Sequence, residues 1–82
     1  MEQMQELSLL RNFEKDSAWF HKNISKLRKE GFTGKFVAID NSQPLASGKD
    51  LNIVMKDIEK KGKNPSYVFI EFVYPEGYTL IL

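Results

Sequence analysis

The N-terminal third of the chain carries apolar residues at helical spacing, followed by a clear stop. The stripe consists of Leu10, Phe13, Phe20, Ile24 and Leu27. Separations of three, four or seven positions predict a helix with one buried face over residues 1–30. Asp16 and Ser17 are good N-cap types, so we expect one helix, or two with the break at these residues. Gly31 can adopt the left-handed conformation that ends it.

The middle of the chain predicts a hairpin and a second helix. Residues 35–40 form a β-branched and aromatic run that predicts a strand, and a turn after it leads to a short return strand at residues 45–47. Ser47 and Asp50 match a capping box at a helix start. The helix ends at Gly62. Its apolar face consists of Leu51, Val54, Met55 and Ile58.

The final segment is the most apolar part of the chain. Residues 66–74 alternate as a strand does, and one face carries Val68, Ile70, Phe72 and Tyr74. The other face carries Tyr67, Phe69, Glu71 and Val73. Residues 75–77 are a tight-turn signal, so Tyr78 to Leu82 are predicted to return as a fourth, antiparallel strand.

These elements predict one α+β domain over residues 1–82. Residues 1–15 would form an N-terminal helical extension, and residues 16–82 a core in the order α-β-β-α-β-β. The expected architecture is a two-layer sandwich, with two helices packed on one face of a mainly antiparallel sheet of three to four strands. Gly31 and Gly62 are separated by the same number of residues as Pro44 and Pro75. This common spacing indicates either two helix–hairpin repeats or two sets of elements that are similar without being repeats. Both interpretations give the same layout.

Composition agrees with a folded domain and excludes several classes of protein. The 82 residues are 41% hydrophobic and 28% charged, and 12 basic residues against 11 acidic ones give a net charge of +1. This balance gives no electrostatic case for a dedicated nucleic-acid or membrane-surface protein. The absence of cysteine excludes disulfides and thiolate sites. The longest uncharged run, Asn41 to Gly48, is too short to span a membrane, and the acidic N-terminus is unlike a secretory signal, so we expect a cytoplasmic protein.

Candidate catalytic and metal-binding residues are few. His21 is the only histidine, and Ser17 and Ser25 one turn away from it supply no orienting acid. Asp40 begins a turn that departs from the calcium-loop pattern, and the glycines match no phosphate-binding fingerprint. A small enzyme or ligand carrier that uses Asp40, Glu71 or His21 is an alternative that would require a pocket. We predict a non-enzymatic domain with no cofactor.

The strongest functional signal is the apolar C-terminal hairpin. Two helices on one side of the sheet would leave its other face uncovered, and contiguous exposed apolar patches usually mark interfaces. We therefore predict a protein–protein interaction module, either a homodimer or a complex with a protein partner, through the sheet face or its edge. The interface residues would be Tyr67, Phe69, Glu71, Val73, Tyr78 and Leu80. The alternative is that residues 1–13 fold back over this face and bury it.

Lysines repeat at helical spacing in both helical regions and favour a second function. The first stripe consists of Lys22, Lys26 and Lys29. The second consists of Lys56, Lys60 and Lys63. If the two stripes were adjacent they would form a basic surface of the kind that binds phosphates, which gives weak nucleic-acid binding as the alternative function. Interleaved acidic residues and the small net charge favour a solvated surface instead.

Four motifs form a recognisable pattern along the chain. They are the aromatic pair Trp19-Phe20, the strand Gly34 to Ala38, the helix start Ser47 to Leu51 and the strand Tyr67 to Phe72. In this pattern the chain resembles a group of small prokaryotic, often archaeal, domains of unknown function, over residues 16–74. The resemblance implies a compact module without an established activity, and it carries over no catalytic residue. The N-terminal stretch and residues 75–82 extend beyond the shared pattern.

Overall fold

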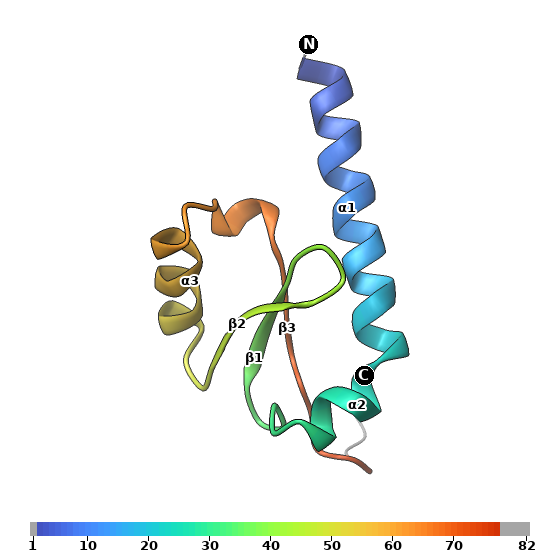
Figure 1. The fold of residues 1–82 in the computed structure, drawn as a ribbon, viewed down its shortest axis with the longest axis vertical. Helices are drawn as coiled ribbons and strands as arrows, with labels where there is room; N and C mark the ends of the chain where they lie inside the picture. The colour runs from blue at the N-terminus through green and yellow to red at the C-terminus, as the bar shows by residue number, and fades with distance from the viewer. Residues whose placement is uncertain (1, 78–82) are drawn as a thin grey trace, which may run out of the picture.

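The computed structural model describes residues 2–77, and describes side chains from Leu10 onward. The elements are α1 (Glu2–Lys22), α2 (Ile24–Lys29), β1 (Phe36–Ile39), β2 (Pro44–Gly48), α3 (Leu51–Lys60), the 3-10 helix η1 (Pro65–Tyr67) and β3 (Phe69–Phe72). The α+β class predicted from the sequence is confirmed (Figure 1). The predicted fourth strand at Tyr78 to Leu82 lies outside the described residues.

The three strands form an antiparallel sheet in the order β2-β1-β3, so β1 is central. Ala38 of β1 pairs with Ala46 on one side and Ile70 on the other. The loop between β1 and β2 is a tight turn in which Asn41 and Ser42 both have positive φ, 52° and 58°. Two left-handed residues match the twist of the flanking strands, which explains the polar turn residues at this position.

The N-terminal helix breaks at a different residue from the one expected. It continues through Asp16 to Lys22 and is interrupted only at Asn23, after which α2 begins. Asp16 does not cap a helix because its carboxylate accepts a hydrogen bond from the backbone N–H of Ser42, 2.8 Å away in the hairpin turn. The predicted stop is confirmed, since Gly31 has a φ of +94°.

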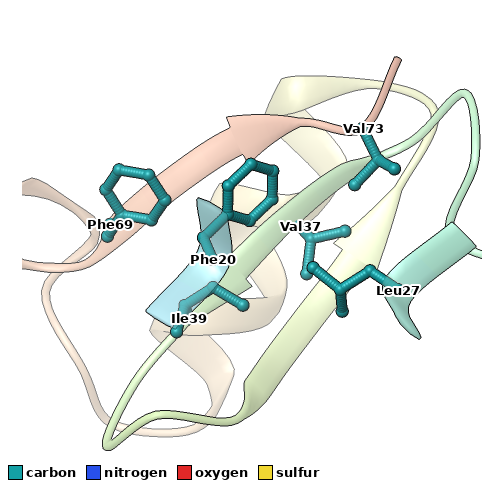
Figure 2. Packing of buried hydrophobic residues seen from close by; sticks show 6 residues of the cluster. All are labelled: Phe20, Leu27, Val37, Ile39, Phe69 and Val73. Atoms are coloured by element: carbon teal, nitrogen blue, oxygen red, sulfur yellow. The ribbon is translucent and has the colours of Figure 1, made fainter. Parts of the chain in front are cut away.

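Two separate hydrophobic cores lie on opposite faces of the sheet. The first consists of Phe20, Leu27, Val37, Ile39, Phe69 and Val73 (Figure 2). The second consists of Ala38, Ala46, Val54, Ile58 and Val68. Because successive strand residues point to opposite faces, α1 and α2 cover one face of the sheet while α3 covers the other (Figure 1). This layering corrects the expectation that both helices pack on one face. The uninterrupted apolar run of β1 is typical of a strand buried on both sides.

Two element boundaries also differ from the sequence analysis. The residue that caps α3 is Asp50, whose carboxylate accepts from the N–H of Asn52, 2.8 Å away, while Ser47 remains in β2. Tyr67 belongs to η1, and β3 begins only at Phe69. From there the predicted alternation is confirmed, because Phe69 and Val73 enter the first core and Val68 the second.

Truncations on either face test this layering. Leu27→Ala and Ile58→Ala each remove a fully buried side chain from a different core, so each should lower the free energy of unfolding by about 2–5 kcal/mol in urea titrations. Ile53→Ala is the control, since 59% of Ile53 is exposed on α3 and the change should stay within about 0.5 kcal/mol. A loss confined to one of the two buried positions would contradict two separate cores.

Candidate functional site

The structure places the predicted interface residues in different environments. Phe69 and Val73 are only 6% and 0% exposed, because α1 and α2 cover their face of the sheet. Phe13 and Phe20 of α1 both pack their rings against Phe69, at centroid distances of 5.3 and 5.6 Å. The N-terminal helix thus covers the face that sequence reasoning left open, which corrects that premise.

The remaining members of the predicted set are partly accessible or not described. Tyr67 is 59% exposed on η1. Glu71 is half-buried on β3, where its Oε1 accepts from the backbone N–H of Phe72 at 3.1 Å. Tyr78 and Leu80 lie outside the described residues. Only Tyr67 therefore offers a large exposed apolar surface among the described members of this set.

The two lysine stripes do not form one surface. The first lies on α1 and α2 and the second on and just after α3, and these helices cover opposite faces of the sheet. Lys63 also forms an ion pair with Asp40, with 2.7 Å between Nζ and Oδ2. Among the described residues the two stripes are not adjacent, so they do not form the single basic surface on which the nucleic-acid alternative depended.

Two exposed apolar side chains lie on α1, the helix whose Asn12 and Asp16 line a cleft together with Tyr67. Leu10 is 54% and Phe13 42% exposed, although sequence spacing assigned both to the buried helix face. The reason is length, since α1 extends well past the sheet it covers (Figure 1). A stripe at helical spacing gives no signal of where along the helix the neighbouring sheet ends.

A small cleft of about 200 Å³ separates this part of α1 from η1. Its lining residues are Asn12, Asp16, Asp40, Lys63, Asn64, Tyr67 and Val68. Asp16 is 5% exposed, and its hydrogen bond to Ser42 joins α1 to the hairpin turn. Asn64 caps η1 through a 3.0 Å bond from the N–H of Ser66. The cleft is therefore lined mainly by polar side chains, two of which are held by hydrogen bonds, together with the aromatic side chain of Tyr67.

A second pocket, of about 310 Å³, lies where β3 faces α1 and α2. It is lined by Phe20, His21, Ile24, Arg28, Glu71, Phe72 and Tyr74. Arg28 Nε donates to the carbonyl oxygen of Tyr74 at 2.8 Å, which links α2 to the chain beyond β3. Sequence analysis did not single out Arg28, because a cation in the last turn of a helix is ordinary.

The described residues offer little catalytic chemistry. His21 and Glu71 line the same pocket, but Asp40 lies at the other cleft beside Lys63. His21 Nδ1 donates to the carbonyl oxygen of Ser17 at 2.8 Å, an interaction within its own helix. Across the side chains described, no three His, Asp or Glu residues gather as metal ligands would. Over residues 2–77 no helix combines the length and apolarity needed to cross a bilayer.

Comparison with known families gives a match over residues 28–75, to the family described as "Family of unknown function (DUF5678)". The match covers more than half of the 82 residues. The chain belongs to DUF5678. No curated protein and no solved structure matches it. The expectation of a small family of unknown function is confirmed. The DUF5678 region contains the whole sheet and α3, whereas α1 precedes it.

The bond between Asp16 and Ser42 joins α1 to the DUF5678 region and can be tested directly. Asp16→Ala leaves the Ser42 N–H without its partner, so it should lower the free energy of unfolding by about 1–3 kcal/mol in urea titrations. Asp16→Asn keeps an acceptor oxygen at this position and should cost clearly less. Equal losses of unfolding free energy in the two variants would show that this hydrogen bond is not the reason that Asp16 stabilises the fold.

Proposed function

We propose that this domain is a non-enzymatic interaction module that self-associates through the N-terminal half of α1. The observation that carries the proposal is the exposure of Leu10 and Phe13 on a helix that extends beyond the sheet (Figure 1). Tyr67, which is also exposed, lines a cleft together with Asn12 and Asp16 of the same helix. Exposed apolar side chains grouped in this way favour an interface.

The length of α1 supports association. Its 21 residues span about 31 Å, yet its described contacts with the sheet are made by side chains from Phe13 onward. The molecule accordingly measures 44 Å along its longest axis and 25 Å along the other two. A helical segment of about ten residues is marginal in water without packing. A second helix packed against the projecting half would stabilise it.

The distribution of charge along α1 favours a second copy in antiparallel orientation. Glu2 and Glu6 occupy the first two turns, and the first basic residues of the helix are Arg11 and Lys15. When two such helices run antiparallel, Arg11 and Lys15 of each lie toward the acidic start of the other, while Glu14 and Asp16 leave residues 11–16 without net charge. This arrangement is isologous, as a two-fold symmetric dimer requires, and opposite charges at these positions help to fix its register.

The DUF5678 match adds a structural reason to look at α1. The match begins at residue 28, so the projecting helix stands outside the family region. The second core is formed by the sheet, α3 and Val68, and no residue of α1 takes part in it. Helix α1 therefore has two uses in this proposal: its C-terminal half covers the sheet and its N-terminal half binds a second copy.

Light scattering after size exclusion tests the proposal. The unaltered chain should approach twice its 9.5 kDa mass as concentration rises, and Leu10→Lys should raise the dissociation constant at least about tenfold. Ile53→Lys is a matched control, because Ile53 is equally exposed but lies on α3 beyond the opposite sheet face. Circular dichroism should show that both variants remain folded. A monomer at every concentration, or equal dissociation by the control, would refute self-association through α1.

A further inference from the structure

The 310 Å³ pocket where β3 faces α1 and α2 combines apolar walls with groups of opposite charge. Its apolar and aromatic lining residues are Phe20, Ile24, Phe72 and Tyr74. Its ionisable lining residues are His21, Arg28 and Glu71. Phe20 belongs to the first core and is only 2% exposed, so this wall is held in place by the fold. The volume is at the lower end of the range of about 300–1,000 Å³ that is typical of ligand sites, which suits a small molecule.

Arg28 places a cation in the wall of this pocket. Its Nε donates to the carbonyl oxygen of Tyr74 at 2.8 Å, which restrains the half-buried guanidinium group. The N–H groups on its two Nη atoms are further donors. A planar fork of this kind matches a carboxylate, which can accept two parallel hydrogen bonds from it. The pocket therefore offers a binding position for a carboxylate.

Glu71 adds a negative charge to the same pocket from the strand β3. It is half-buried, and its Oε1 accepts from the backbone N–H of Phe72 at 3.1 Å, which holds the carboxylate close to the strand. Its Oε2 can accept hydrogen bonds from a ligand. A charge attracts an opposite charge more strongly in such half-buried surroundings than in bulk water. An ammonium group is the ligand group that complements Glu71.

Arg28 and Glu71 do not neutralise each other. Among the described residues the ion pairs are formed by Lys61 and Lys63, outside this pocket. His21 is exposed, and its Nδ1 is occupied by a backbone carbonyl of its own helix. Two opposite charges that share a pocket without pairing match a ligand that carries both charges itself.

We propose that this pocket binds a free α-amino acid with a large apolar side chain. The carboxylate of the ligand accepts from Arg28, its ammonium group donates to Glu71, and its side chain packs against Phe20 and Ile24. A ligand with only one of the two charges leaves the other charged group of the pocket without a partner, so the zwitterion is preferred. The site lies apart from Leu10 and the N-terminal half of α1, so it does not depend on self-association.

A comparison of three ligands tests the two charges separately. L-Phenylalanine carries both, phenylpropionate lacks the ammonium group and phenethylamine lacks the carboxylate. In nuclear magnetic resonance titrations of the isotope-labelled chain, L-phenylalanine should shift the amide signals of Arg28, Glu71 and Phe72 to saturation. Each analogue should bind at least about tenfold more weakly. The absence of saturable shifts with L-phenylalanine, or equal affinity for either analogue, would overturn the proposal.

The variant Glu71→Gln tests the ammonium position and retains an acceptor oxygen for the N–H of Phe72. It should weaken the binding of L-phenylalanine by about tenfold without weakening that of phenylpropionate, which has no ammonium group. Glu76→Gln is the matched control, because Glu76 is exposed and does not line the pocket, so it should change neither affinity. Equal weakening of both ligands by Glu71→Gln, or an equal loss in the control, would contradict a contact between Glu71 and the ammonium group.

Discussion

The apolar character of β1 on both faces is the constraint on which the rest of this structure depends. Val37 and Ile39 point to one side of the sheet and Ala38 to the other, and all three are fully buried. A three-stranded sheet with two apolar faces requires a cover on each side. Helices α1 and α2 provide one cover and α3 the other, so the central strand is protected by helices on both sides (Figure 1).

This use of the helices decides which surfaces remain for function. The first face is occupied by the chain itself, so Phe69 and Val73 stabilise the fold and are not available to a partner. Within residues 2–77, what remains is the part of α1 that outruns the sheet and the outer edge of β3. These surfaces differ in kind: one presents exposed side chains such as Leu10, whereas the other lies beside a pocket lined by Phe20 and Ile24.

Sequence reasoning predicted the elements well because their signals are local. Helical spacing, the stop at Gly31 and the alternation around Phe69 all appear as expected. It could not place the elements relative to one another: the carboxylate of Asp16 matches a helix cap in sequence but binds Ser42 across the fold. The face covered by each helix depends on such tertiary contacts, and for that reason sequence reasoning left Phe69 and Val73 on an open face although α1 and α2 cover them. The family membership was predictable because the match is to the sequence itself, over residues 28–75, and needs no knowledge of the tertiary contacts.

The opposite placement of the helices is the central structural claim, and nuclear Overhauser effects in solution test it most directly. Protons of the Phe20 ring should show contacts with the methyl groups of Val37 and Ile39, while those of Ile58 should show contacts with the methyl group of Ala38. Neither set should cross to the other face of β1. Contacts from both Phe20 and Ile58 to the same face would contradict the two-core arrangement and every functional surface assigned from it.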